Sequence, residues 1–460
     1  MIVTMMLCAS TLQAKDYLVK LKNQKSATAQ MKSAGFDDWY LVEEKDLSIK
    51  NKANIEYIQP NYKISLLHNF QSNDPVMRQM AQKALAQKTV TISDNPQIPP
   101  NTPERRIGLD PLFSKQWGMK DIGVENLSLS PRKIQHEVVV AVLDTGVDYT
   151  HPDLVSNIWR NEGETGVDSN GKNKESNGID DDGNGYVDDV VGWDFAGNDS
   201  FPYDLTLSPM DIILKGGNPG HGTHCAGNVA ARSNNATGIS GVAGMLKIMP
   251  LRFLSEKGEG TTLDAVKAIR YAVDNGAKVL SNSWGSEGED SNDAENRILR
   301  ETIEYAQERG VLFIAAAGNG HQGKGYDNDT DAKPGYPASY SYETIVSVAA
   351  IDAGNELGSF SNWGKNSVDL AAPGVKVFST VPLNKYSDVV IDLFGMKVTW
   401  DGTSMATPHV AGAAALYWSL HPEKQWYEIK EDLLKATVKV ASLRGKIRSE
   451  GKLNLNNLIR

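Results

Sequence analysis

Strand-like apolar segments alternate with segments of helical periodicity over most of the chain. The strand-like runs occupy residues 138–143, 248–254, 278–282, 311–316 and 345–350. Helical patterns lie between them, as in 262–274 and 293–309. Short apolar runs are typical of strands buried on both faces, and their alternation with helices favours a parallel sheet covered by helices on each side. The pattern predicts an α/β domain with a mostly parallel sheet over residues 108–460.

The N-terminal part of the chain has a different pattern. Residues 1–14 are apolar and end in a small residue, which predicts a signal peptide and a secreted protein, extracellular or periplasmic. Residues 15–68 carry two strand-like segments, DYLVKLK and IEYIQPNYKISLL, and predict a small separate unit. Residues 69–107 combine a helical pattern over 75–90 with the proline-rich SDNPQIPPNTPERR, which predicts a linker with a processing point near residue 107. Arg105-Arg106 is one candidate for that point, although paired arginines in a linker are more often incidental.

Four polar residues stand in settings that suit acyl transfer. They are Asp144 in VVVAVLDTGVD, His221 in GNPGHGTHCAG, Asn319 in LFIAAAGN and Ser404 in DGTSMATPHVAG. A serine hydroxyl needs a base to take its proton, and an imidazole titrates near neutrality. A carboxylate holds that imidazole in one tautomer and stabilises its charged form. We therefore predict a triad of Asp144, His221 and Ser404, with the Asn319 amide and the Ser404 backbone N–H as donors to an oxyanion.

The local sequence predicts that these residues meet at one edge of the sheet. Asp144 and Asn319 each follow an apolar run, at the carboxyl end of a strand, where open α/β sheets bind their ligands. Ser404 precedes an apolar helix predicted over 405–420, whose start offers free N–H groups. Pro408 is expected in the first turn of that helix, where its missing N–H does little harm.

In the chain order Asp, His, Ser, these segments resemble the active site of the subtilisin family of serine proteases, of the thermitase and proteinase K type. The resemblance implies a subtilisin-like three-layer α/β fold. It implies a serine endopeptidase of broad specificity, which cuts peptide and protein substrates through an acyl-enzyme. It also implies that residues 15–68 are an inhibitory propeptide, a small α/β domain closing with YIQPNY. The chain would then be a zymogen carrying its own intramolecular inhibitor.

The resemblance extends to a substrate cleft. SNSWGSEG, residues 281–288, is similar to the family strand that pairs with the substrate backbone, and residues 316–318 are similar to the opposite wall of the primary pocket. The implied lining residues are Ser283, Trp284, Gly285, Ala317 and Gly318. Gly335-Tyr336-Pro337 is similar to the pocket's base, where relatives carry a cis proline. Main-chain pairing grips any extended peptide and therefore favours broad specificity.

An acidic loop, NGIDDDGNGYVDD at residues 177–189, matches the start of a calcium-binding loop. Oxygen-bearing side chains alternate, a glycine follows for the sharp turn, and a backbone carbonyl comes next. The predicted ligands are Asp180, Asp182, Asn184, Tyr186 and Asp188. Val191 stands at the twelfth position, where an EF-hand has a bidentate Glu, so Asp188 or Asp189 has to complete the coordination. A solvated acidic turn is the alternative.

A second calcium site is implied by resemblance to thermitase-like proteases. Relatives bind the ion with an Asp in NDPYF and with the Asp of HPDL, which correspond to Asp110 in LDPLF and Asp153 in HPDL. The loop ARSNNATGI implies Asn234 as a further ligand, together with the backbone carbonyls of Arg232, Thr237 and Ile239. The implied consequence is that chelation lowers heat resistance.

The charge and the composition of the chain bear on which partners the protein can have. The net charge of −10 over 460 residues does not favour nucleic acid or an anionic membrane as a partner. No segment after residue 14 reaches the roughly 18 apolar residues of a membrane span, and we expect a monomer.

The two cysteines, Cys8 and Cys225, exclude a disulfide framework, and Cys225 is predicted to be a small buried hydrophobe. His224 stands three residues after His221, but no further zinc ligands accompany this pair.

Two other functions stay open from the sequence alone. One is a non-catalytic calcium-binding or adhesion protein on a retired protease scaffold. Retired enzymes usually lose a triad member or the oxyanion Asn, whereas this chain keeps all four residues. The other is a selective processing convertase, whose relatives carry a further β-rich domain that we do not expect here.

Overall fold

The centre of the molecule is a nine-stranded, mostly parallel sheet. The computed structural model describes residues 16–47, 54–67, 79, 110–127, 136–287, 296–321, 323–393 and 396–459. The strands of the sheet are β6 (Val139–Asp144), β7 (Trp193–Asp194), β8 (Lys247–Arg252), β10 (Val279–Asn282), β12 (Leu312–Ala316), β14 (Ile345–Ile351), β15 (Leu370–Pro373), β20 (Val438–Lys439) and β21 (Gly451–Lys452). Their order is β20-β21-β15-β14-β12-β10-β6-β8-β7, and only β20 and β21 pair antiparallel. The predicted parallel sheet is confirmed.

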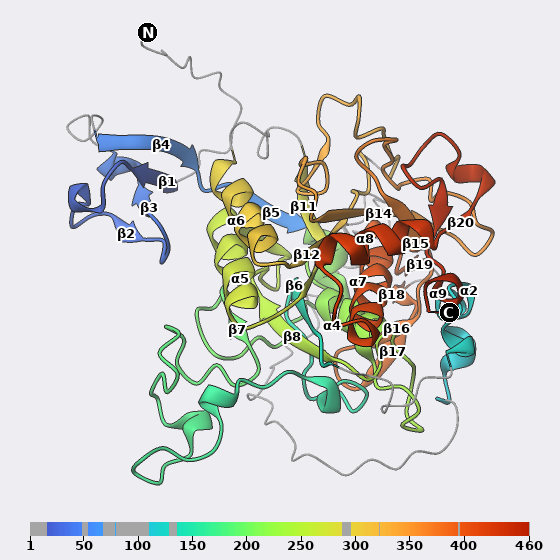
Figure 1. Ribbon diagram of the computed structural model, residues 1–460, viewed down its shortest axis with the longest axis horizontal. Coiled ribbons are helices and arrows are strands. Elements are labelled where there is room, and N and C mark those ends of the chain that lie inside the picture. The colour runs from blue at the N-terminus through green and yellow to red at the C-terminus, as the bar shows by residue number, and fades with distance from the viewer. Residues whose placement is uncertain are drawn as a thin grey trace.

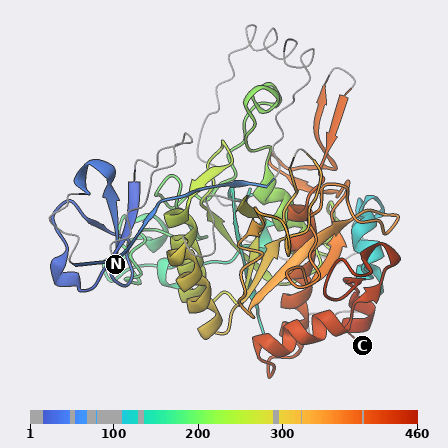
Figure 2. The same ribbon diagram turned by 90° about the horizontal axis from the view of Figure 1, so that it is seen from above.

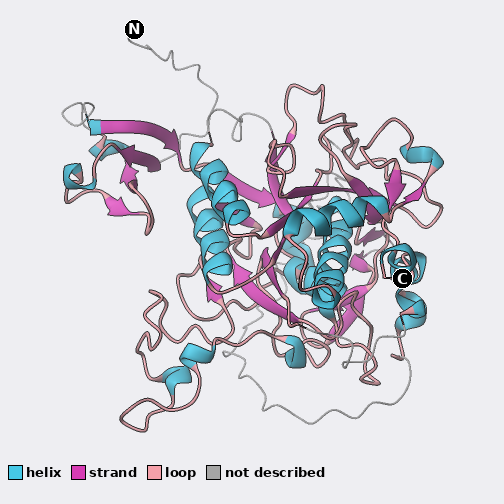
Figure 3. Cartoon of the chain, viewed as in Figure 1, coloured by secondary structure: helices cyan, strands magenta, loops and turns pink. Residues whose placement is uncertain are grey.

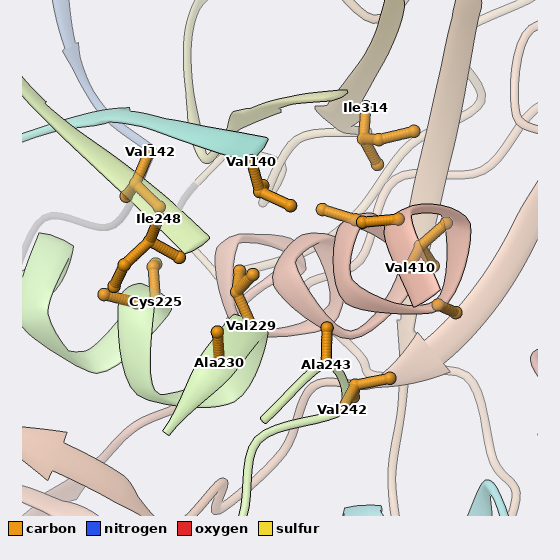
Figure 4. Close-up of a cluster of buried hydrophobic side chains, with 14 of the residues drawn as sticks. Val140, Val142, Cys225, Val229, Ala230, Val242, Ala243, Ile248, Ile314 and Val410 are labelled. Atoms are coloured by element: carbon orange, nitrogen blue, oxygen red, sulfur yellow. The ribbon is translucent and has the colours of Figure 1, made fainter. Parts of the chain in front are cut away.

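Helices cover both faces of this sheet (Figure 1, Figure 3). On one face lie α4 (His221–Ala230) and α7 (Thr403–Leu420), and on the other lie α5 (Thr262–Asp274) and α6 (Arg297–Glu308). Alternate residues of β6 belong to two separate apolar cores, one on each face of the sheet. Val140 and Val142 pack with α4 and α7 (Figure 4), whereas Ala141 and Leu143 pack with α5 and α6. Since successive side chains of a strand point to opposite faces, a strand between two helical layers has to be apolar throughout. The three-layer α/β fold is therefore confirmed.

Shorter elements surround the three layers. The helices are α2 (Trp117–Asp121), α3 (Pro209–Lys215), α8 (Trp426–Lys435) and α9 (Leu455–Leu458). Two antiparallel hairpins are formed by β16 (Ser379–Val381) with β17 (Lys385–Ser387), and by β18 (Val389–Leu393) with β19 (Met396–Thr399). None of the helices within the described ranges is both long and apolar enough to cross a membrane.

A small antiparallel sheet forms the N-terminal unit. Its strands are β1 (Asp16–Leu21), β2 (Lys32–Ser33), β3 (Trp39–Glu43) and β4 (Ile55–Pro60), in the order β2-β3-β1-β4. Within residues 16–47 and 54–67 the helical turns are short 3-10 turns at 24–26 and 44–46. Leu18 and Trp39 are fully buried and belong to the same apolar cluster as α5 and α6. The unit therefore packs on the α5–α6 face of the large domain.

The predicted strand IEYIQPNYKISLL is wrong as a single element. It divides after Pro60, and β5 (Lys63–Leu66) leaves the small sheet to cross to the large domain (Figure 1, Figure 2). Proline cannot donate to a β-ladder, so the pairing ends there. Two free N–H groups at the start of α5 are then satisfied by this connection: Thr262 N donates to Tyr62 O (2.8 Å) and Leu263 N to Asn61 Oδ1 (3.0 Å).

The predicted signal peptide, the helix over 75–90 and the linker with Arg105-Arg106 lie outside the described residues, apart from residue 79. The helix predicted over 262–274 has those bounds in the structure. Its first turn carries a capping box, in which Thr261 Oγ1 accepts from Asp264 N and the Asp264 carboxylate accepts from Thr261 N.

Candidate active site

Asp144 and His221 are in contact at the carboxyl end of β6. Nδ1 of His221, the first residue of α4, lies 2.7 Å from Asp144 Oδ1 and 2.9 Å from Oδ2. Both residues are fully buried. Burial alone lowers the pKa of His221, but the adjacent Asp144 carboxylate raises it well above its usual value. Nε2 is also buried and has no partner within the described structure, so it is available to accept a proton.

The start of α4 is held close to β6 by a side-chain cap and a glycine. Asn218 Oδ1 accepts the N–H groups of Gly220 (2.8 Å) and His221 (2.9 Å). These N–H groups belong to the helix start, where intrahelical partners are lacking. A Cβ added at Gly222 would lie 2.0 Å from Gly146 O, so only glycine permits this approach. The local sequence GHG therefore sets the position of the imidazole.

Asp204 is a buried residue of this site that the sequence did not reveal. Its Oδ1 accepts from Thr145 Oγ1 (2.9 Å) and Asn218 Nδ2 (2.6 Å), and its Oδ2 accepts from Thr223 N (2.9 Å) and Oγ1 (2.6 Å). Burial raises the pKa of Asp204 to about 6. The carboxylate joins the residue after Asp144 to the helix that carries His221. An isolated Asp in the loop before α3 has no spacing that signals this role.

Ser404 is the second residue of α7, and its side chain faces β10 and the strand after it. Ser404 Oγ donates to Ser283 O (3.0 Å). Cys225 contacts both residues: its Sγ is 3.5 Å from the backbone carbonyl oxygen of Ser404 and 3.9 Å from His221 Nδ1. The serine and the histidine therefore share one buried sulfur atom as a neighbour.

The expected place of Pro408 in the first helical turn is wrong. The helix begins at Thr403 rather than at residue 405, which makes Pro408 its sixth residue. Since proline has no N–H, the Ser404 carbonyl loses its helical partner. Ser283 Oγ (2.9 Å) and the Cys225 thiol (3.5 Å) donate to that carbonyl instead. Two hydrogen bonds therefore join Ser283 and Ser404. The Ser283 hydroxyl donates to the Ser404 carbonyl, and the Ser283 carbonyl accepts from the Ser404 hydroxyl.

Asn319 is oriented by the residue that precedes the serine. Its Oδ1 accepts from Thr403 N and from Thr403 Oγ1, both at 2.8 Å. The amide Nδ2 is buried and has no partner among the described residues. A Cβ added at Gly402 would lie 3.2 Å from this Nδ2 and 3.6 Å from Ser404 N. Two N–H donors therefore border one small space that the glycine leaves open.

The predicted cleft strand is β11 (Trp284–Glu287), which pairs antiparallel with β13 (Gly335–Tyr336). Tyr336-Pro337 is a cis peptide, as the resemblance implied. A Cβ at Gly285 would lie 2.6 Å from Tyr336 O, so the two strands approach closely there. The Trp284 side chain is buried in the core at 5.1 Å from the Phe253 ring, so this residue offers its backbone to the cleft.

Ala317 and Gly318 continue from β12 toward Asn319. Ala317 is fully buried, and its carbonyl accepts from Asn328 Nδ2 (2.8 Å) and Asn362 Nδ2 (3.3 Å). Gly318 has a φ of +113°, and a Cβ there would lie 2.4 Å from Asn362 Nδ2. This turn therefore requires glycine, and it leads the chain from the strand to the amide of Asn319.

A strand of the N-terminal unit fills the cleft. In a second sheet, ordered β13-β11-β5-β9, β5 lies between β11 and β9 (Glu259–Thr261). On one side Leu66 pairs with Trp284, and Ser65 with Gly285. On the other side β5 pairs antiparallel with β9 over residues 63–65. The cleft predicted to take an extended peptide therefore holds the chain's own residues 63–66.

The acidic loop contains a cluster of three carboxylates. Ligand-capable oxygens of Glu164, Asp180 and Asp182 lie within 4.8 Å of one another. Glu164 is buried: its Oε1 accepts from Asp181 N (2.7 Å), and its Oε2 has no partner in the described part of the chain. Clustered carboxylates repel one another, and an all-oxygen donor set is the type that Ca²⁺ prefers. The residues present therefore fit a calcium ion.

The other predicted ligands of this loop have different contacts. Asp188 accepts from Gly178 N (3.2 Å), and Asp189 accepts from Asn161 Nδ2 (2.9 Å) and the Tyr271 hydroxyl. The Tyr186 ring packs on Trp193 and Tyr271, and Asn184 Nδ2 donates to Asp182 Oδ2 (3.1 Å). The residue that joins Asp180 and Asp182 is thus Glu164, rather than Asp188 or Asp189. No calcium-loop spacing points to Glu164, because it lies in a separate turn of the chain.

Asp110 and Asp153 meet at the loop after α4. Asp110 accepts from the backbone N–H groups of Asn234 and Asn235, both at 3.0 Å. Asn234 itself is exposed, and it is Asn235 whose side chain reaches Asp153 Oδ1 (2.8 Å). Ile239 N donates to Asp153 Oδ2 (2.8 Å). Burial raises the pKa of Asp153 to about 7, which indicates that these bonds only partly compensate its charge. Two buried carboxylates, that of Asp153 with incompletely compensated charge, fit a cation, and the neighbouring asparagine side chain is that of Asn235 rather than the predicted Asn234.

Two further predicted features concern the core below the site. Cys225 is fully buried in the apolar cluster (Figure 4), and burial raises the pKa of its thiol. His224 stacks on Trp400 with ring centroids 4.3 Å apart, and its Nε2 lies 2.9 Å from Val377 O. Burial lowers the pKa of His224 to about 3, so it stays neutral. Both residues therefore contribute to packing.

Comparison with known proteins identifies the family. The model of the subtilase family (Peptidase_S8) matches residues 135–456. A thermophilic serine proteinase of Bacillus sp. (strain AK1) is 34% identical over 316 residues, which are 66% of this chain and 61% of that protein. Thermitase of Thermoactinomyces vulgaris is 36% identical over 277 residues, 60% of this chain and 73% of that protein. The chain belongs to the subtilase family.

A solved structure supports the same fold. Fervidolysin from Fervidobacterium pennivorans, described as a keratinolytic enzyme related to subtilisin, superposes with a TM-score of 0.64 at 23% identity. The match covers 97% of this chain and 60% of that one. The chain thus spans about three fifths of the length of fervidolysin and of the Bacillus proteinase.

Proposed function

We propose that this protein is a secreted, calcium-stabilised serine endopeptidase that is made as a zymogen. The observation that carries the proposal is the buried contact of Asp144 with His221 at 2.7 Å, beside Ser404 and an unpaired buried amide of Asn319. An imidazole with a free Nε2 is a base, and a buried N–H donor without a partner is suited to a charge that develops during reaction.

In the proposed mechanism Ser404 Oγ turns from Ser283 O to His221 Nε2. The imidazole takes the hydroxyl proton as Oγ attacks a peptide carbonyl, and Asp144 stabilises the imidazolium. The oxyanion enters the space beside Gly402 and accepts bonds from Asn319 Nδ2 and Ser404 N. His221 then gives its proton to the leaving amine, and water hydrolyses the acyl-enzyme by the same proton route.

The substrates proposed are extended peptide segments of proteins, bound as a strand between β9 and β11. Backbone pairing on both sides supports broad specificity. Residues 16–67 act in the proposal as the intramolecular inhibitor, because β5 holds this position. The ion pair of Lys20 with Glu301 (2.9 Å) and the bond from Trp39 Nε1 to Glu301 (2.9 Å) orient the small sheet on α6. Desolvation offsets much of the energy of such a partly buried ion pair, so in the proposal the buried apolar contacts dominate the docking.

A fluorophosphonate probe tests the proposed function. We expect stoichiometric labelling of the processed protein at Ser404, located by peptide mass spectrometry. Ser404→Ala and heat-denatured wild type are the controls and are expected to stay unlabelled. Absence of labelling in folded, processed wild type would instead favour the non-catalytic calcium-binding or adhesion protein.

Calcium removal is expected to lower thermal stability. We propose one ion at Glu164, Asp180 and Asp182 and another at Asp110, Asp153 and Asn235. Saturation at 100 times Kd contributes about 2.7 kcal/mol per site. In a Ser404→Ala background, which prevents self-digestion, calorimetry with calcium or with EGTA measures the shift in Tm.

A matched pair of substitutions tests the first of these sites. Glu164→Gln is expected to remove part of the calcium-dependent shift in Tm, since it removes one buried carboxylate from the cluster. The control is Glu162→Gln, an exposed carboxylate of the same turn, which is expected to keep the whole shift. Equal calcium dependence of the two variants would contradict this site.

A further inference from the structure

The pairing of β5 with β11 determines which residue of the N-terminal unit lies nearest to Ser404. In the antiparallel register Ser65 faces Gly285 and Leu66 faces Trp284. This is the last pair of the two strands, since β5 ends at Leu66 and β11 begins at Trp284; Leu67 and Ser283 are the next residues beyond it. The carbonyl of Ser283 accepts the bond from Ser404 Oγ at 3.0 Å. Continued by one residue, the same register would place the backbone of Leu67 beside Ser283 and therefore near the hydroxyl of Ser404.

The side chain of Leu67 lies against the wall predicted for the primary pocket. Its Cδ2 is 3.0 Å from the position that a Cβ on Gly285 would take. The absent side chain of Gly285 thus makes room for the leucine. Leu67 is partly buried there, so a carboxylate in its place would lose part of its hydration.

The residues before Leu67 make apolar contacts on one side of the strand and a polar contact on the other. Ile64 (2% exposed) and Leu66 (9%) belong to the apolar cluster that includes Trp284. Leu66 N donates to Gly258 O (3.0 Å), and Leu66 Cδ1 lies 2.9 Å from where a Cβ of Gly258 would be. On the opposite side of the strand the exposed Lys63 pairs with Glu259 (2.5 Å). Apolar side chains at two alternate positions therefore anchor the strand.

We propose that the chain cuts itself after Leu67, and that its active site prefers aliphatic residues at the first, second and fourth positions before the cut bond, which are Leu67, Leu66 and Ile64 here. The inference rests on the proposed function, since it uses Ser404 as the nucleophile. It moves the processing point from the vicinity of residue 107 to residue 67. Ser404 Oγ bonds to the carbonyl carbon of Leu67, and its proton passes to His221. That proton moves to the amide nitrogen as the C–N bond breaks, and water releases Leu67 as a free carboxylate.

The first test is the C-terminus of the small fragment released by the full chain. We expect intact-mass analysis at early times to find a fragment ending at Leu67, and Ser404→Ala to give no fragment. Leu67→Asp is expected to slow the cut by roughly 10- to 100-fold, because a carboxylate must be desolvated. Leu67→Met is the matched variant that keeps the wild-type rate. A double Arg105→Ala, Arg106→Ala variant is expected to release the same fragment at the same rate.

A first cut elsewhere, with the bond after Leu67 intact in a spanning peptide, would overturn the inference. Peptide substrates added to wild-type enzyme avoid any folding defect of the variants. We expect kcat/KM for Ile-Ser-Leu-Leu-p-nitroanilide to exceed that for Ile-Ser-Leu-Asp-p-nitroanilide by at least the same roughly 10- to 100-fold. Equal values would also contradict it. If Ser404 takes the fluorophosphonate while the cut lies elsewhere, only this inference fails, whereas an unlabelled and inactive protein would refute the proposed function itself.

Discussion

Replacing Ser404 by Ala is expected to lower kcat for peptide hydrolysis by about 10⁶-fold, the loss found when the nucleophile of subtilisin is removed. The neighbouring hydroxyl of Ser283 does not take its place, because its Oγ is already bonded to the backbone carbonyl of residue 404 at 2.9 Å. The substitution removes one hydrogen bond from the folded state, at a cost of about 1 kcal/mol, so the fold is expected to persist. Circular dichroism and the calcium-dependent Tm check that expectation.

The variant must be measured with its cleft open, because β5 fills the cleft in the uncut chain. A trace of wild-type enzyme is used to cut Ser404→Ala at the native site. The wild type is then inactivated with a fluorophosphonate, to which the variant is insensitive. Hydrolysis of a peptide nitroanilide by this preparation gives the residual rate.

His221→Ala, treated in the same way, is expected to lose a similar factor, and the double variant with Ser404→Ala is expected to lose no more than either single one. Residues that act as one unit are non-additive in this sense, because the base has no task once the nucleophile is gone. Losses that multiply in the double variant would mean that the two residues act separately, and the proposed triad would be wrong.

Asn319→Ala is expected to lower kcat by about 10²–10³-fold and to leave KM nearly unchanged. The amide Nδ2 borders the space beside Gly402 and has no ground-state partner in the described structure, so its bond forms only as the oxyanion develops. Steady-state kinetics on one peptide nitroanilide separates the two constants.

Asn319→Asp provides the control for a merely structural role. It keeps an oxygen to accept the bonds from Thr403 N and Oγ1, both 2.8 Å in the structure, but it removes the N–H donor. We expect kcat to fall at least as far as in Asn319→Ala. Wild-type kcat in Asn319→Asp would show that Asn319 acts through Thr403 and is no oxyanion donor.

Local sequence was sufficient to predict the parallel sheet, and for a physical reason. A strand covered on both faces has to be apolar throughout, so residues 138–143 are recognisable without their neighbours. The candidate site residues Asp144 and Asn319 come directly after such strands, and Ser404 stands at a helix start. Each short motif thus contains both the element and the residue that the element positions.

The tertiary structure alone decided those features that depend on contacts between distant segments. Glu164 joins Asp180 and Asp182 from another turn, and Asp204 bonds to the start of α4 from a loop. The path of the chain after Pro60 depends on α5, whose free N–H groups bind Asn61 and Tyr62, and the pairing of Leu66 with Trp284 joins segments more than 200 residues apart. Periodicity and motif spacing record only the surroundings of a residue along the chain, whereas these contacts arise from packing and hydrogen bonding between segments far apart in it.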